Sequence, residues 1–251
     1  MESMTRLIWD RCRSSTTIAD GVRQQATFHA DNGCPGLRQR IIHVEPGSTA
    51  GFPPASGDDV LFVLAGEGRM RLGADDDDHT LVPETGVYVQ PGESYEIVAD
   101  GERTLELLAV EVPDPPSGIE VGERRVTLRV NDAEAQQATA NREFRLVVTP
   151  DAGCPSVTQF VGYIPVGRAP EHFHRYDEVV YVLEGEGSLH IGGESAPLRP
   201  GSCLHLPARL VHCLENAGPG TMQVLGVFRP AGSPAEAYYP DGTPAAVPQE
   251  A

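Results

Sequence analysis

The amino-acid sequence predicts an all-β protein in which two similar barrels or jelly rolls follow one another. Three observations predict this class: an internal repeat, short apolar runs separated by turn residues, and a composition rich in turn formers. The chain has 251 residues, enough for two domains of roughly 100–150 residues each. Its 27 glycines and 22 prolines favour many short strands joined by tight turns over long helices.

The internal repeat emerges when the sequence is compared with itself at a shift of 120 residues, where residues 31–35 (DNGCP) match residues 151–155 (DAGCP). Residues 60–68 (VLFVLAGEG) match residues 179–187 (VVYVLEGEG) at a shift of 119 residues. Surface turns tolerate such single-residue deletions, so two copies of one fold explain the pattern.

Each copy contains the same series of short strands. Residues 60–64 and 179–183 are apolar runs that end in Gly-Glu-Gly, which predicts a hairpin turn in which glycine supplies a positive φ. A return strand and a further strand before a proline are expected in both copies. These are residues 69–72 and 87–90 in the first copy, and residues 188–191 and 203–206 in the second.

Residues 112–118 (VPDPPSG) are too rich in proline to continue a strand, and we predict that they link the two copies. The chain is thereby divided into an N-terminal domain, residues 1–117, and a C-terminal domain, residues 118–251. The tail from residue 229 onward carries several prolines and small residues. We expect it to pack across the second barrel rather than to extend it.

The chain is acidic, with a formal net charge of −17, and all its basic residues apart from histidine are arginines. A nucleic-acid partner is not expected, because phosphate binding needs a basic patch. Schiff-base and lysine-base mechanisms are excluded. No apolar run approaches the roughly 20 residues that cross a bilayer, and the charged residues 1–13 do not resemble a signal peptide. The sequence therefore predicts a cytoplasmic protein with no membrane segment.

The five cysteines are odd in number and form no CxxC pair. In a cytosolic chain we expect them to be small buried hydrophobic residues rather than disulfides or a zinc cluster. They are Cys12, Cys34, Cys154, Cys203 and Cys213.

Potential metal ligands gather in the second copy. His172 and His174 are two residues apart, so on a strand both imidazoles project from one face. The turn before Glu178 can bring its carboxylate to the same interior, and His212 can close the site from the opposite side, after the turn at Pro207. Three neutral imidazoles and one carboxylate suit a divalent transition ion: Fe, Mn, Co, Ni, Cu or Zn.

These residues resemble the two motifs of the cupin superfamily, G-x5-H-x-H-x3,4-E-x6-G and G-x5-P-x-G-x2-H-x3-N. Since the repeat covers both halves, the resemblance implies a bicupin: tandem double-stranded β-helix (cupin jelly-roll) barrels with a metal site in the C-terminal barrel. Two departures from the motifs remove no ligand. Four residues rather than five separate Gly167 from His172, and Arg209 stands where the second motif has glycine.

The first copy lacks this ligand set. At the positions of the four ligands, in chain order, the alignment of the repeats places Pro53, Ala55, Asp59 and Glu96. We therefore expect one metal ion per chain and a structural role for the first barrel. A separate ligand pocket around Arg40 and His43 remains an alternative.

The resemblance implies a six-coordinate metal, at which four protein ligands leave two positions open. A chelating substrate, or a substrate together with dioxygen, can occupy them. We therefore expect a metal-dependent enzyme that acts on a small metal-chelating organic acid or enol, and a dioxygenase-type oxidoreductase is the first hypothesis. An aminohydrolase or isomerase similar to the bicupin ureidoglycine aminohydrolase, and a non-catalytic cupin that binds a small molecule, remain open.

The expected cofactor is one divalent transition metal ion, Fe or Mn first. Glu178 is predicted to be catalytic as well as a ligand, because it is the only anionic ligand and can take a proton from a substrate. Tyr176, in the turn between the ligands, is a candidate proton donor, and His205, on the strand before Pro207, is a candidate base. The expected partners are a small-molecule substrate and a second copy of the chain in a homodimer.

Overall fold

The computed structural model of the chain confirms the all-β class, and it describes residues 4–9, 15–73 and 77–245. Nearly all regular structure in these ranges is strand. The exceptions are a one-turn helix, α1 (Met4–Leu7), and short 3-10 turns. The 3-10 turns are Ala30–Asn32, Val130–Asp132 and Pro150–Ala152. No helix in the described ranges is long and apolar enough to span a membrane.

The chain forms two compact units that do not follow it as two uninterrupted halves. The described residues 15–73, 77–132 and 147–156 form the first unit, which we call the N-terminal barrel. The described residues 4–9, 133–146 and 157–245 form the second unit, the C-terminal barrel. The domains predicted as residues 1–117 and 118–251 thus describe the repeat, whereas packing assigns segments of each half to the other unit.

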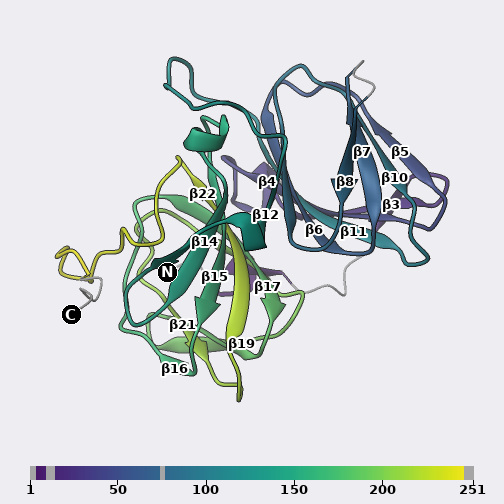
Figure 1. Cartoon of the computed structure of the whole chain (residues 1–251). Helices are drawn as coiled ribbons and strands as arrows, with labels where there is room; N and C mark the ends of the chain where they lie inside the picture. The colour runs from purple at the N-terminus through teal and green to yellow at the C-terminus, as the bar shows by residue number, and fades with distance from the viewer. Residues whose placement is uncertain (1–3, 10–14, 74–76, 246–251) are drawn as a thin grey trace. The chain divides into compact units, whose positions relative to one another are not determined.

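The N-terminal barrel consists of a seven-stranded and a four-stranded sheet that share one apolar core (Figure 1). The larger sheet has the order β12 (Thr127–Arg129), β9 (Thr85–Val89), β6 (Asp58–Ala65), β11 (Leu105–Val112), β4 (Arg38–Val44), β3 (Val22–Phe28) and β2 (Thr16–Ala19). The smaller sheet has the order β5 (Thr49–Phe52), β10 (Tyr95–Ala99), β7 (Gly68–Leu72) and β8 (Asp78–Leu81).

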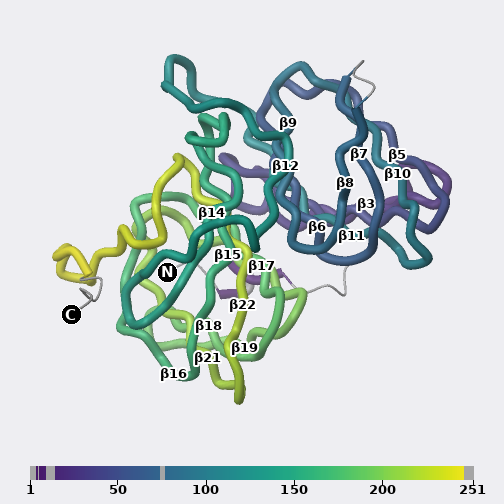
Figure 2. Tube along the Cα trace, viewed as in Figure 1, coloured from purple at the N-terminus to yellow at the C-terminus, as the bar shows by residue number. Residues whose placement is uncertain are grey.

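The C-terminal barrel repeats this arrangement, and the path of its chain can be followed in Figure 2. Its larger sheet has the order β1 (Ile8–Trp9), β20 (Cys203–Leu206), β17 (Asp177–Glu184), β22 (Met222–Arg229), β15 (Thr158–Ile164), β14 (Glu143–Val148) and β13 (Ala135–Gln137). Its smaller sheet has the order β16 (Gly167–Arg168), β21 (Cys213–Asn216), β18 (Gly187–Ile191) and β19 (Glu194–Leu198).

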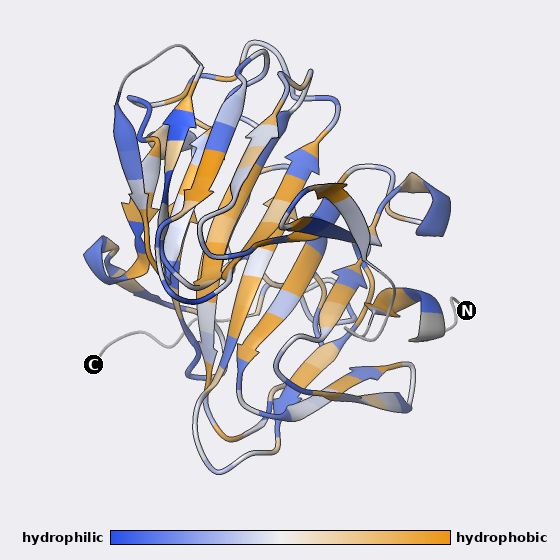
Figure 3. Ribbon diagram, turned by 90° about the vertical axis from the view of Figure 1, so that its right-hand side faces the viewer, coloured by the Kyte–Doolittle hydropathy of each residue, from blue (hydrophilic) through white to orange (hydrophobic). Residues whose placement is uncertain are grey.

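The strands of both barrels carry runs of hydrophobic residues (orange in Figure 3), and side chains from both sheets of a barrel meet in its core. In the C-terminal barrel this core contains Val180 and Leu204 from the larger sheet and Leu189 from the smaller one. It also receives Ile8 of β1, because β1 pairs antiparallel with β20. The beginning of the chain therefore completes the second barrel, although the repeat assigns it to the first.

The two Gly-Glu-Gly segments are not the hairpin turns that the sequence suggested. They carry the chain from the larger sheet to the smaller one, since β6 and β7, like β17 and β18, lie in different sheets. Glycine is nevertheless required for the predicted reason, because Gly66 and Gly185 have φ of 79° and 85°. A Cβ on Gly66 would also lie 2.4 Å from the carbonyl oxygen of Thr104. The crossing between sheets is thus too crowded for a side chain.

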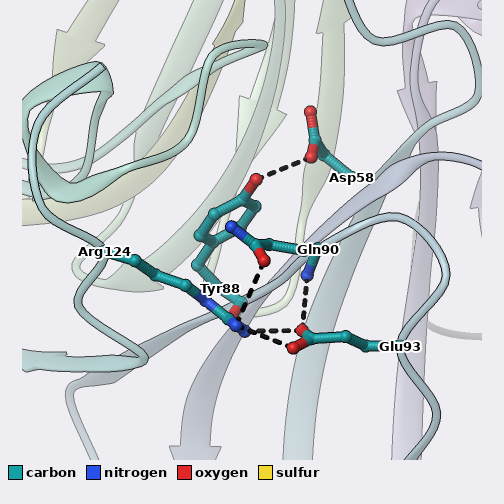
Figure 4. Close-up of polar contacts among 5 residues, drawn as sticks. All are labelled: Asp58, Tyr88, Gln90, Glu93 and Arg124. Atoms are coloured by element: carbon teal, nitrogen blue, oxygen red, sulfur yellow. Dashed lines mark hydrogen bonds and ion pairs between the residues drawn. The ribbon is translucent and has the colours of Figure 1, made fainter.

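The segment after β11 remains with the N-terminal barrel because Arg124 fastens it there (Figure 4). The two terminal nitrogens of Arg124 lie 2.6 and 2.7 Å from the carboxylate oxygens of Glu93, and one of them also donates to the Tyr88 carbonyl. The Tyr88 hydroxyl donates to the fully buried Asp58 at 2.8 Å. Asp58 also accepts from Ser156, so this residue is held in the same unit. These polar contacts explain why packing assigns both segments to the first unit.

The tail and the cysteines confirm the sequence predictions where the structure describes them. Phe173 and Tyr238 exchange backbone hydrogen bonds of 2.8 and 3.0 Å, so the tail packs across the C-terminal barrel. The cysteines at positions 34, 154, 203 and 213 are buried and are not joined in disulfide bonds, whereas Cys12 lies outside the described residues.

Candidate metal centre

The three histidines of the second repeat converge inside the C-terminal barrel. His172 and His212 form an isolated β-bridge, in which each backbone N–H donates to the carbonyl of the other at 3.0 and 2.9 Å. His174 follows two residues later, and its carbonyl accepts from Arg209 N–H at 2.7 Å. One potential ligand atom of each histidine lies within 4.8 Å of the other two. We call these residues the ligand group.

Each ring of the ligand group is oriented by a backbone carbonyl. The Nδ1 atom of His172 lies 3.0 Å from the Pro170 oxygen, and that of His212 lies 2.9 Å from the Leu210 oxygen. The Nδ1 atom of His174 lies 2.9 Å from the Glu236 oxygen, which belongs to the tail. A carbonyl can only accept, so each Nδ1 carries the proton and each Nε2 has a free lone pair. This is the arrangement by which proteins orient histidine ligands of metals.

Burial keeps these imidazoles neutral. It lowers the pKa of His174 to about 4, with the neighbouring His172 as the next cause. Burial likewise lowers the pKa of His172 and places that of His212 well below its usual value. Neutral imidazole is the form that binds a divalent transition metal, so the group is ready for an ion at neutral pH.

Glu178, the fourth predicted ligand, lines the same cavity. Its carboxylate lies outside the set of histidine nitrogens that are all within 4.8 Å of one another. It lies on β17, and burial raises the pKa of its carboxyl to about 8. A divalent ion beside it would reverse this effect, because a bound cation favours the ionised carboxylate. The donor set of three imidazoles and one carboxylate therefore fits the predicted transition metal.

The ligand group opens into a cavity with about 540 Å³ of empty space, part of which is open to solvent. Its wall includes the large apolar side chains of Phe144, Phe160, Ile164, Leu214, Val224 and Phe228. Such a wall excludes water from one side of a bound molecule and leaves the polar end to the ligand group.

Arg142 also lines this cavity, although no motif in the sequence identifies it. It lies in the hairpin formed by β13 and β14, which also contributes Ala138 and Phe144 to the cavity wall. The turn of this hairpin has positive φ at Ala140 and Asn141. Asparagine in a two-residue turn is a recognisable signal, but no ligand or nucleotide motif accompanies it.

Two residues predicted to be catalytic do not lie where the prediction requires. Tyr176 packs in an apolar cluster, with its ring 5.0 Å from that of Phe228, and is not among the residues that line the cavity. His205 pairs with Val179 on the sheet, one residue beyond Glu178, so strand alternation points it to the opposite face from Glu178. There His205 Nε2 lies 3.8 Å from Asp177 Oδ1. Of the three candidates, only Glu178 reaches the cavity.

The pairing registers correct the alignment of the two repeats by one residue. Ala99 lies opposite Gly68 on β7, just as Asn216 lies opposite Gly187 on β18. Since Gly68 and Gly187 correspond, the same register puts Tyr95, not Glu96, at the position of His212. Tyr95 in turn pairs with Phe52 as His212 pairs with His172. The N-terminal counterparts of the three histidines are therefore Phe52, Ala55 and Tyr95.

An arginine occupies the corresponding interior of the N-terminal barrel. Arg40 Nη2 donates to the carboxylate of Asp59 and, at 3.1 Å, to the hydroxyl of Tyr95. The Tyr95 hydroxyl donates to Asp59 at 3.0 Å, and its ring stacks on Phe52 at 4.6 Å. Burial opposes the charge of Arg40, but Asp59 outweighs it and raises the pKa of the guanidinium. Because His43 lies at an odd position from Arg40 along β4, the two do not share the pocket considered above.

Arg209, which stands where the second cupin motif has glycine, keeps the backbone conformation that glycine favours. Arg209 has φ of 67°, in the left-handed region that glycine favours, and its side chain is exposed. Its counterpart in the N-terminal barrel is Gly92, with φ of 83°. The motif residue Asn216 holds its turn by donating to the carbonyls of Ile164 and Gly220 at 2.8 and 2.7 Å.

Comparison with known sequences supports the resemblance. A family model described as a cupin domain matches residues 159–228, which contain all four predicted ligands. An uncharacterised protein of Aquifex aeolicus is 29% identical over 77 residues, which are 31% of this chain and 63% of that protein. A Streptomyces cyaneus protein named polyketide synthase CurC is 40% identical over 55 residues, which are 22% of this chain and 36% of that protein. Both matches span less than two thirds of the relative's own length.

Among solved structures, an oxalate decarboxylase variant of Bacillus subtilis superposes with a TM-score of 0.73 at 12% identity. The superposition covers 90% of this chain and 78% of the decarboxylase chain, so it includes both barrels. At this identity the likeness concerns the fold alone. The family match thus identifies residues 159–228 as a cupin domain, and the two barrels give the chain the fold of a two-domain cupin, or bicupin.

Proposed function

We propose that this bicupin is a metal-dependent enzyme that acts on a small metal-chelating organic acid or enol, with a dioxygenase-type oxidation as its reaction. The observation that carries the proposal is the ligand group itself: three neutral imidazoles, each with Nδ1 on a carbonyl, beside Glu178 in an apolar cavity. An unused interior has no physical need for this arrangement, since a buried carboxyl without a partner is costly. Assembly as a homodimer and a cytoplasmic location stay predictions.

The residues of the site have distinct roles in this proposal. His172, His174 and His212 hold one divalent transition ion, Fe or Mn first, through their Nε2 atoms. When bound, the ion supplies Lewis acidity to a chelated substrate and a redox centre for dioxygen. Glu178 balances the charge of the ion and accepts a proton as the substrate binds in its anionic form. Phe160 and the other apolar wall residues exclude water from the reacting carbons.

An enol is favoured among the possible substrates by the nature of one relative. The Streptomyces cyaneus protein is named as a polyketide synthase, and polyketides contain β-dicarbonyl units whose enol forms chelate divalent ions. An aromatic or planar unsaturated body also suits the phenylalanine-lined wall of the cavity.

The experiment is to load the protein anaerobically with Fe(II) or Mn(II) and to measure dioxygen uptake with a panel of small hydroxy-acids, oxo-acids and β-diketones. We expect Glu178→Gln to retain the ion and to lose turnover about a hundredfold or more, because general-base catalysis typically contributes that much. Full activity in Glu178→Gln would leave this residue without a proton-transfer role.

The same panel distinguishes the other functions. Turnover that proceeds without dioxygen would replace the dioxygenase with a hydrolase or isomerase. Binding of a substrate without any turnover would make the chain a small-molecule-binding cupin.

A further inference from the structure

Arg142 brings a positive charge into the cavity of the ligand group. It directly follows the turn of the β13–β14 hairpin, where Ala140 and Asn141 have φ of 60° and 55°. The Arg142 N–H closes this turn on the Thr139 carbonyl at 3.4 Å. Positive φ at both central residues is typical of a type I′ turn, which holds the ends of a hairpin in a defined geometry. The position of Arg142 at the cavity is therefore built into the hairpin.

The guanidinium of Arg142 has few partners for a buried charge. Nη2 donates to the Leu214 carbonyl at 2.5 Å, the side chain also hydrogen-bonds to Cys213, and burial lowers the pKa of the group. Among the described residues, its buried acidic neighbour in the cavity is Glu178, which acts on it by Coulombic attraction and not through a hydrogen bond. Glu143 at the wall is exposed and accepts from Gln137 Nε2 at 2.9 Å. An arginine has five N–H donors, so several remain for a molecule in the cavity.

The charges of the cavity do not balance without an anion. Glu178 offers the buried negative charge, since Glu143 is exposed and solvent screens its carboxylate, whereas Arg142 and a divalent ion together carry three positive charges. Two positive charges would then remain beside an apolar wall, where water cannot stabilise them well. The three histidines cannot compensate, because they are neutral.

We propose that Arg142 is the residue that selects the substrate, by binding a carboxylate whose molecule chelates the metal with a second oxygen. This inference rests on the proposed function and narrows its substrate class to carboxylic acids. The planar guanidinium matches a carboxylate with two parallel hydrogen bonds, a geometry that neither an amide nor an alcohol reproduces. Arg142 thus discriminates acids from neutral chelators of the same shape.

The test uses two pairs of probes of matched shape: oxalate with oxamide, and salicylate with salicylamide. The full-length protein is loaded with Mn(II), its manganese content is measured, and binding of each probe is followed by calorimetry. We expect the wild type to bind each acid more tightly than its amide. In Arg142→Gln we expect the manganese content to stay unchanged and the acids to bind about ten- to a hundredfold more weakly, as for the loss of a charged hydrogen-bond pair.

Arg145→Gln is the matched control, because Arg145 lies on the same hairpin and donates to the Ala133 carbonyl instead of lining the cavity. It should bind manganese and the acids like the wild type. Arg142→Lys should recover part of the affinity, since it keeps the charge without the planar fork. The inference is wrong if the manganese-loaded wild type binds neither acid, binds acid and amide alike, or binds acids as tightly after Arg142→Gln. A wild type that takes up no metal would instead overturn the proposed function.

Discussion

The two barrels of this chain share their strands and differ in the cation that their interiors accommodate. In the C-terminal barrel, three neutral histidines and Glu178 form a site that a metal ion fits. In the N-terminal barrel, the guanidinium of Arg40 lies against Asp59, the counterpart of that glutamate. The guanidinium of Arg40, a cation of the chain itself, thus occupies the interior position at which the other barrel can take up an ion from solution.

The exchange also involves a residue of the cavity wall. The pairing registers place Arg40 opposite Ala109 and Phe160 opposite Gly226, at equivalent positions of the two barrels. Phe160 lines the cavity of the C-terminal barrel, whereas Arg40 extends into the polar contacts of its own barrel. The same fold therefore gives a cavity lined by the ligand group in one copy and an internally neutralised ion pair at the corresponding place in the other.

The largest expected effect concerns the ion pair of Arg40 and Asp59 in the N-terminal barrel. Arg40→Met should lower the free energy of unfolding by about 3–5 kcal/mol, because it leaves the buried Asp59 without its cation. Arg38→Met, which breaks an exposed pair with Glu111, should cost less than about 1 kcal/mol. Urea unfolding followed by circular dichroism measures both. Equal stability of Arg40→Met and Arg38→Met would show that the Arg40 guanidinium is not the cation that the buried Asp59 requires.

A smaller effect is expected from the tail of the C-terminal barrel, because Glu236 orients His174 through its carbonyl. In Gly232→Ala the new Cβ would lie 2.1 Å from the ring of Tyr176, so the tail must shift. We expect metal affinity to fall about tenfold, as for the loss of a contact that orients a ligand. Gly220→Ala, where nothing lies within 4 Å of the added atom, is the control. Metal titration of the two variants gives the comparison, and equal affinities would leave the tail without a part in the site.

The smallest effect concerns the turn that carries arginine in one barrel and glycine in the other. Arg209 is exposed and has φ of 67°, a conformation that costs a residue with a side chain about 1 kcal/mol. Arg209→Gly should therefore raise the melting temperature by a few degrees, and Gly92→Ala should lower it. Destabilisation by Arg209→Gly would mean that the arginine makes a compensating contact.

Much of the C-terminal site could be predicted from the sequence because its ligands are close in the chain or belong to motifs. His172 and His174 share a short segment, and the spacing to Glu178 suffices to place it in the same interior. The counterparts in the first barrel were harder to identify, since no ligand pattern marks them. The alignment of the repeats was wrong by one residue there, so it matched His212 with the exposed Glu96 instead of the buried Tyr95. An error of one residue has this effect because successive residues of a strand face opposite ways.

The remaining differences depend on contacts between segments far apart in the chain. Arg142 reaches the cavity through a hairpin that precedes the motifs by some thirty residues, which only the folded chain reveals. The pairing of β1 with β20 joins the beginning of the chain to the second barrel. Tyr176 was placed correctly in a turn and His205 on a strand, but these local positions do not say which way either side chain points. Local patterns do not determine such long-range pairings.

The metal content of the purified protein tests the contrast between the barrels most directly. After incubation with excess Mn(II) and removal of unbound ions, elemental analysis should give one manganese per wild-type chain. His174→Ala should retain little, and Asp59→Asn should still bind one ion if it remains folded, because the N-terminal interior takes no part in binding. Two ions per wild-type chain, or one ion retained after His174→Ala, would contradict the assignment of the single metal centre to the C-terminal barrel.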